Sequence, residues 1–99
     1  MKAGREGVWT EPARRDLRDI YLYIAQDNPY AARALQNEIR RRVMLLQDNP
    51  QLGRPGRVEG TRELVMGDSP YILPYRVRHE RVEILAVFHG ARMWPSRFE

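Results

Sequence analysis

The chain has 99 residues, with 17 Lys and Arg against 13 Asp and Glu for a formal net charge of +4, and it contains no cysteine. This length suits one domain with one modest core, and the lack of cysteine excludes disulfides, thiol catalysis and Cys-based zinc sites. Apolar runs such as Ile84 to Phe88 are far shorter than the roughly 20 residues of a membrane-spanning helix, and residues 1–12 lack the apolar core of a signal peptide. We therefore expect a single cytoplasmic domain over residues 1–99.

The basic residues are almost all arginine, since Lys2 is the only lysine. Arginine binds carboxylate or phosphate through two parallel hydrogen bonds and stacks on aromatic rings, whereas a merely solubilising surface uses lysine as readily. The composition therefore favours an anionic partner.

The first predicted helix follows a short extended segment, Val8 to Thr10. Thr10, Glu11 and Pro12 form a typical helix start, with a capping hydroxyl, an acid and a proline suited to the first turn. Apolar residues then recur at helical spacing up to Ile24, namely at Ala13, Leu17, Ile20 and Ile24. A helix from Glu11 to about Ile24 is predicted.

A second helix is predicted from Pro29 to Gln47. Asn28 precedes a proline, so it can end the first helix and cap the next. The buried stripe of the second helix is Ala32, Leu35, Ile39, Val43 and Leu46, and Pro50 lies just beyond its end. The two elements form a helical hairpin.

Three strands are predicted after a loop at residues 50–61. The loop holds several glycines and prolines together with Arg54 and Arg57, and the apolar period then changes to two. The strands run from Arg62 to Met66, from Tyr71 to His79 and from Val82 to Phe88. The fold class is α+β, in the order β-α-α-β-β-β, with the helical hairpin packed on one face of a small, mostly antiparallel sheet.

The middle strand alternates between two faces. Its Tyr71, Leu73, Tyr75 and Val77 should face the helices, and its Ile72, Pro74, Arg76 and Arg78 should face the other side. Pro74 lacks a ladder donor and indicates a bulge or an unpaired side. Because two helices cover only one face, we expect the second face to be open, with Arg76, Arg78, His89 and Arg92 lining a shallow cationic groove.

Several segments together resemble the RelE/ParE superfamily of toxins from bacterial type II toxin–antitoxin modules. They are Thr10-Glu11-Pro12-Ala13, Gly60-Thr61-Arg62-Glu63-Leu64, Tyr71-Ile72-Leu73-Pro74-Tyr75-Arg76-Val77 and the run from Ile84 to Pro95 that contains His89-Gly90-Ala91-Arg92-Met93-Trp94-Pro95. The resemblance covers nearly the whole chain. It implies a toxin neutralised by a cognate acidic antitoxin in a hetero-oligomer.

The superfamily has two activities on one fold, so the fold does not decide between them. RelE-like members cleave mRNA on the ribosome with mainly Lys, Arg and a C-terminal Tyr, while ParE-like members poison DNA gyrase. Arg92 matches one basic position of the ribonuclease set, but Ile72 and Glu63 fall where basic residues are expected and the C-terminal phenol is absent. The resemblance therefore favours the gyrase-poisoning branch. Ribosome-dependent mRNA cleavage is the alternative, and a degenerate, non-toxic binding module is the second alternative.

The candidate residues for binding the target or the antitoxin are Arg62, Arg76, Arg78, His89, Arg92 and Trp94. A ribonuclease would use Arg92, His89 and Arg76. Each has a structural reading as well: His89 can end a strand with a backbone hydrogen bond, and Trp94 can pack on the core. The run Arg40-Arg41-Arg42 is typical of a solvated helix face paired with Glu38. No metal site and no cofactor are expected.

Overall fold

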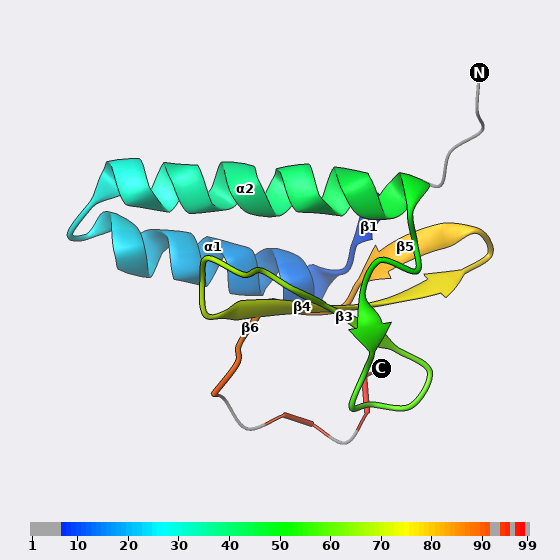
Figure 1. Ribbon diagram of the computed structural model, residues 1–99. Helices are drawn as coiled ribbons and strands as arrows, with labels where there is room; N and C mark the ends of the chain where they lie inside the picture. The colour runs from blue at the N-terminus through cyan, green and yellow to red at the C-terminus, as the bar shows by residue number, and fades with distance from the viewer. Residues whose placement is uncertain (1–6, 92–93, 96, 99) are drawn as a thin grey trace.

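The computed structural model describes residues 7–91, 94–95 and 97–98. Helices α1 (Glu11–Ala25) and α2 (Pro29–Asp48) form one layer, and a sheet of short strands lies beneath them (Figure 1). Both predicted helices are confirmed to within one residue at their ends. Within the described residues, neither helix is long and apolar enough to cross a membrane.

Both helices begin at the capping residues that the sequence indicated. The Thr10 hydroxyl oxygen accepts from the backbone N–H of Ala13 at 3.4 Å and donates to the carbonyl of Ile84 at 2.7 Å. The Asn28 side-chain oxygen accepts from the N–H of Ala31 at 3.0 Å. Thr10 therefore both starts α1 and ties it to the sheet.

The sheet is mixed. Its strands are β1 (Gly7–Trp9), β2 (Arg54–Pro55), β3 (Arg62–Val65), β4 (Tyr71–Arg78), β5 (Arg81–Ile84) and β6 (Phe88–His89), in the order β1-β5-β4-β3-β2 with β6 also paired to β4. β1 runs parallel to β5, and the other described pairings are antiparallel. The short strand β2 lies inside the segment that we expected to be only a loop.

The predicted final strand, residues 82–88, is interrupted. β4 pairs with β5 up to Ile84 and with β6 from Phe88, so three residues, 85–87, stand opposite only two residues of β4. Pro74 lies at this bulge and accepts from the N–H of Leu85 at 2.9 Å, while its own ring nitrogen has no proton to donate. The bulge expected from Pro74 is therefore present, in the partner segment.

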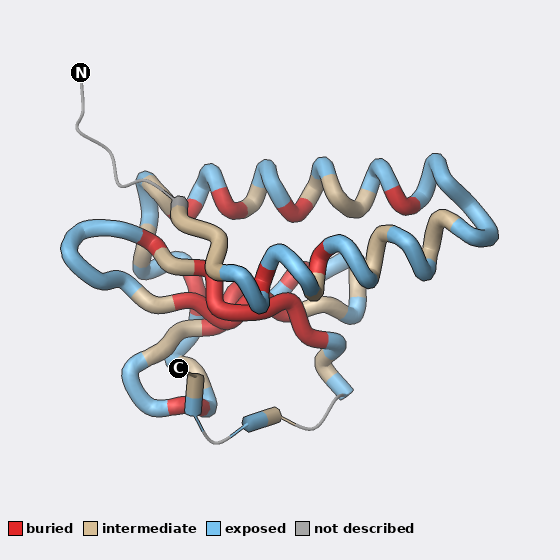
Figure 2. The backbone as a smooth tube through the Cα atoms, turned by 180° about the vertical axis from the view of Figure 1, so that it is seen from behind, coloured by how far each residue is buried: buried red, intermediate tan, exposed pale blue. Residues whose placement is uncertain are grey.

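The core lies between the helices and the sheet, where the buried segments concentrate (Figure 2). Tyr75 is fully buried there; its hydroxyl donates to the carbonyl of Pro50 at 2.7 Å and accepts from the N–H of Gly53 at 2.8 Å. A Cβ at Gly53 would lie 2.7 Å from this hydroxyl, which explains the glycine. Tyr75 thus holds the start of the loop after α2 against the core.

The opposite face of the sheet is not open, so the prediction of a bare floor is wrong for the central part of the sheet. Ile72 and Pro74 are buried there, and Phe88 lies beside Ile72 across the β4–β6 pairing. The loop that carries β2 and the described C-terminal residues, 94–95 and 97–98, lie beneath the sheet (Figure 1), and Trp94 and Phe98 pack against Phe88. Ile72 and Phe88 would form an exposed apolar patch on that face if nothing covered them, and other parts of the chain bury them. We call this loop and C-terminal layer the underside.

Candidate functional site

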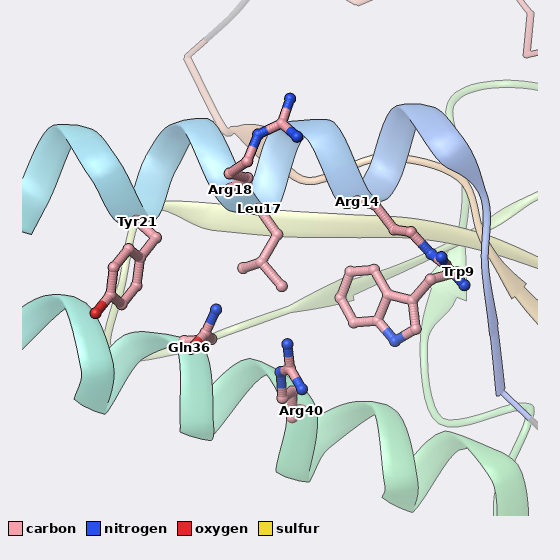
Figure 3. Close-up of a pocket in the computed structure, with 7 residues that line it drawn as sticks. All are labelled: Trp9, Arg14, Leu17, Arg18, Tyr21, Gln36 and Arg40. Atoms are coloured by element: carbon pink, nitrogen blue, oxygen red, sulfur yellow. The ribbon is translucent and has the colours of Figure 1, made fainter.

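A groove of about 490 Å³ lies between the two helices (Figure 3). It is lined by one residue of β1, four of α1 and two of α2: Trp9, Arg14, Leu17, Arg18, Tyr21, Gln36 and Arg40. Leu17 points into the space between the helices, with Trp9 toward one end and Tyr21 toward the other (Figure 3). We call this feature the helical groove.

Helical spacing brings these side chains together. Residues 14, 17, 18 and 21 of α1 recur every three or four positions and so share one face, and residues 36 and 40 of α2 are one turn apart. Leu17 is 6% exposed and forms the apolar floor. Met44, one turn beyond Arg40 along α2, is 65% exposed, so apolar surface continues past the groove.

The helical groove is cationic. Three of its residues are arginines and none is acidic. Within the described part of the chain, no carboxylate lies within ion-pair distance of Arg14, Arg18 or Arg40. Arginines around an apolar floor suit a partner that carries carboxylates beside an apolar side chain.

The three consecutive arginines on α2, Arg40 to Arg42, have different surroundings. Arg41 and Arg42 both donate to Glu38, at 2.8 and 2.7 Å, as the sequence indicated for a solvated face. These hydrogen bonds lower the pKa of Glu38 to about 2. Arg40 instead lies in the helical groove. Sequence reasoning missed this site because the signal, the approach of Arg14 and Arg40, needs the packing of two helices.

Arg76 and Arg78 share one carboxylate within the chain. Nε of Arg76 donates to Glu83 at 2.8 Å, and a terminal guanidinium nitrogen of Arg78 lies 3.6 Å from the same carboxylate oxygen. Glu83 is the cross-strand neighbour of Arg76, so antiparallel pairing places it on the same face. The hydrogen bond from Arg76 is the main cause of a lowered pKa of Glu83. Glu83 therefore balances one of the two positive charges, and the side chain of Arg78 remains 50% exposed.

His89 lies at the other end of β4. It is paired with Tyr71, five residues from Arg76, or about 17 Å along the strand. Its Nδ1 accepts from the N–H of Ala91 at 3.1 Å, and its ring meets Tyr71 edge-on, with centroids 5.8 Å apart. The structure thus does not bring His89 together with Arg76 in one groove.

His89 instead helps to line a cavity of about 320 Å³ at the other flank of α1, with Asp16, Asp19, Ile20, Tyr71 and Val87. Asp16 accepts from the N–H of Val87 at 3.0 Å and so fastens α1 to the bulge. Burial raises the pKa of Tyr71, and nearby Tyr23 adds to this. No group of three metal-ligating side chains forms here or elsewhere in the described residues.

The remaining predicted site residues have separate places. Arg62 lies on the same face as Tyr75, its cross-strand neighbour, and donates to the carbonyl of Gly53 at 2.6 Å. Trp94 belongs to the underside. Arg92 falls outside the described residues.

Glu63 is a residue whose importance the sequence did not indicate. It is 2% exposed, on β3, and its two oxygens accept from Arg54 at 2.9 Å and from Nε of Arg57 at 3.0 Å. The backbone N–H of Arg57 also donates to it at 2.9 Å. Burial alone would raise the pKa of Glu63, but these hydrogen bonds outweigh burial and hold its pKa below the usual value.

Known proteins resemble this chain over most of its length. Residues 8–94 match the family model described as ParE toxin of type II toxin–antitoxin system, parDE. A curated protein of Sinorhizobium fredii (strain NBRC 101917 / NGR234) named "Putative toxin Y4kP" is 47% identical over 88 residues, which are 89% of this chain and 91% of that protein.

Two solved structures share the fold. One is a chain of the chromosomal ParDE toxin–antitoxin system from P. aeruginosa, with a TM-score of 0.76 and 32% identity over 86% of this chain and 95% of that one. The other is a chain of the toxin–antitoxin complex RelBE2 from Mycobacterium tuberculosis, with a TM-score of 0.63 and 29% identity over 88% of this chain and 99% of that one. With the family model matched over most of its length, the chain belongs to the ParE toxin family of type II toxin–antitoxin systems.

Proposed function

We propose that this toxin arrests growth by binding and poisoning DNA gyrase, and that a cognate acidic antitoxin neutralises it by occupying the helical groove. The family membership over residues 8–94 is the observation that carries the choice of gyrase. Gyrase acts in the cytoplasm, so that compartment is the proposed site of action.

Ribosome-dependent mRNA cleavage has less support. A ribonuclease must place a base, an acid and cations around one phosphate. His89 and Arg76 lie about 17 Å apart along β4, too far to act on the same bond, and Arg76 is already paired with Glu83. Ile72 and Glu63 also stand at positions where basic residues are expected, which counts against cleavage, while Arg92 lies outside the described residues.

An acidic antitoxin segment fits the helical groove for two reasons. The three arginines of the groove, which form no ion pair among the described residues, attract carboxylates, and Leu17 with Met44 offers apolar surface to an amphipathic helix. Both solved relatives come from toxin–antitoxin systems. The antitoxin is expected to be the product of a short acidic reading frame that overlaps or abuts this one.

Induced expression of the chain tests the target. We expect loss of DNA supercoiling in cells and inhibition of purified gyrase, with transcripts intact by primer extension. Codon-phased cuts in mRNA would instead support the ribonuclease, and normal growth would support a non-toxic binding module.

Charge reversal in the helical groove tests the antitoxin site. R40E should weaken binding of the acidic antitoxin about tenfold or more, because it removes an attraction and adds a repulsion. R41E is the matched control, since Arg41 neighbours Arg40 but pairs with Glu38 outside the groove. Equal losses in the two variants, measured by calorimetry, would contradict this site.

A further inference from the structure

The indole of Trp94 is held by a guanidinium on one side and an aromatic ring on another. The central carbon of the Arg57 guanidinium lies 3.7 Å from the centroid of the indole ring, a stacked cation–π contact. The ring of Phe88, on β6, meets the indole edge-on with centroids 5.0 Å apart. Trp94 thus connects the C-terminal segment to both the sheet and the loop after β2.

Arg57 is itself held in place by Glu63. The carboxylate accepts from both the backbone N–H and the side chain of Arg57, so it fixes the loop and the direction of the guanidinium together. Arg54 binds the same carboxylate but makes no cation–π contact among the described residues. A chain of contacts therefore runs from β3 through Glu63 and Arg57 to Trp94.

In this arrangement the indole N–H of Trp94 lacks a hydrogen bond to any described residue, while the ring is held in one orientation. The indole Nε1 of Trp94 is buried and has no hydrogen-bond partner within the described residues, although buried indole N–H groups usually find one. Glu63 is buried to 2% exposure, which is costly for a carboxylate, and buried ion pairs are weak evidence for stability. We read the network as a device that orients the indole.

The loop after β2, which carries Arg57, lies on the opposite side of the sheet from the two helices (Figure 1). The side chain of Arg57 is 42% exposed and Trp94 is partly exposed. Tryptophan and arginine are the residue types most enriched at the energetic centres of protein interfaces. A partner that reaches the underside therefore meets a preformed arginine–tryptophan pair.

We propose that Glu63 and Arg57 are positioning residues: they hold Trp94 so that the underside forms the target-binding surface of the toxin, separate from the helical groove. This inference rests on the proposed gyrase poisoning. It implies that toxicity depends on the Arg57–Trp94 stack and that antitoxin binding does not.

R57K against R54K is the decisive comparison. Both substitutions keep a positive charge for Glu63, so both variants should fold, but only R57K removes the planar stack on Trp94. We expect R57K and W94A to raise the toxin concentration for half-inhibition of gyrase supercoiling about tenfold. R54K should leave it unchanged, and all three should bind the antitoxin like the wild type.

Tryptophan fluorescence in a W9F background reports the position of Trp94 directly. R57K should shift its emission maximum and increase its quenching by acrylamide, and R54K should do neither. If wild-type toxin inhibits gyrase but R57K and R54K inhibit it equally, or if antitoxin affinity falls together with inhibition, the inference is overturned. If wild-type toxin does not inhibit gyrase, the proposed function itself fails.

Discussion

Single residues determine the role of each charge in this molecule. Arg40 and Arg41 are neighbours, yet Arg41 is neutralised by Glu38 while Arg40 faces the helical groove. Glu63 is the reverse case: a strand carboxylate, at a position where the superfamily resemblance leads one to expect a basic residue, becomes the buried anchor for two arginines. The arginine bias predicted an anionic partner, but which arginines are available depends on the neighbouring carboxylates.

Glu63 should make stability fall in acid. Its pKa is lowered in the folded state, so its contribution is present above the unfolded value, about 4.3, and is lost as pH falls through the lower folded value. E63Q should reduce the free energy of unfolding at pH 7 by about 1 to 3 kcal/mol and should flatten its decline below about pH 5.

Urea denaturation across pH 2 to 7 measures this effect. E59Q is the control, because Glu59 is exposed and makes no ion pair with another described residue. A steep acid decline that persists unchanged in E63Q would show that other carboxylates cause it.

At the scale of elements, the β4–β5 hairpin contains backbone strain. Its two turn residues, His79 and Glu80, have φ values of 52° and 61°, in the left-handed region that favours Asn and Gly. The hairpin extends beyond the helical layer (Figure 1), and its strands are joined by the Arg76–Glu83 pair. The two left-handed turn residues therefore add a steric cost to an otherwise regular hairpin.

Replacing the turn with Asn-Gly should stabilise the protein. H79N/E80G should raise the free energy of unfolding by about 1 kcal/mol, because it removes the steric cost of two left-handed residues. E80A is the control: it removes the same charge but keeps a Cβ at positive φ. A thermal melt in which E80A stabilises as much as H79N/E80G would assign the gain to charge instead of backbone strain.

At the scale of the whole molecule, the sheet separates two surfaces. The two helices, whose side chains line the helical groove, lie on one side, and the underside lies on the other (Figure 1). The core between the helices and the sheet is built from residues of both layers, including Leu17, Ile39, Leu73 and Ile84. Because the two surfaces share no contact among the described residues, a substitution in one is expected to leave the other unchanged.

The double variant R40E/R57K tests this independence. Its losses in antitoxin binding and in gyrase inhibition should equal those of the single variants to within about 0.5 kcal/mol, as expected for distant sites without common partners. Calorimetry and a supercoiling assay provide the two readouts. A larger coupling would mean that the sheet transmits changes from one surface to the other.

The sequence by itself determined the helical hairpin, both helix caps, the two strands β3 and β4 and the disturbance at Pro74, but it missed β2 and the interruption between β5 and β6. These features depend on residues within a few positions of one another: Thr10 caps Ala13, Asn28 caps Ala31, and apolar periods of 3.6 and 2 define the helices and strands. The family resemblance added the toxin assignment, which the comparisons confirm.

Only the tertiary structure decided which faces are covered and which charges are free. Glu63 on β3 joins Arg57 only six positions earlier in the chain. Arg57, however, meets Trp94 across 37 positions of sequence, and Arg14 and Arg40, which line one groove, are 26 positions apart. No local pattern encodes such pairs, because they arise when the helices pack together and the C-terminal segment turns beneath the sheet. The open floor expected beneath the sheet is covered at its centre for the same reason, because Trp94 and Phe98 pack on Phe88. Arg76 and Arg78, farther along β4, share the carboxylate of Glu83, which antiparallel pairing places beside them.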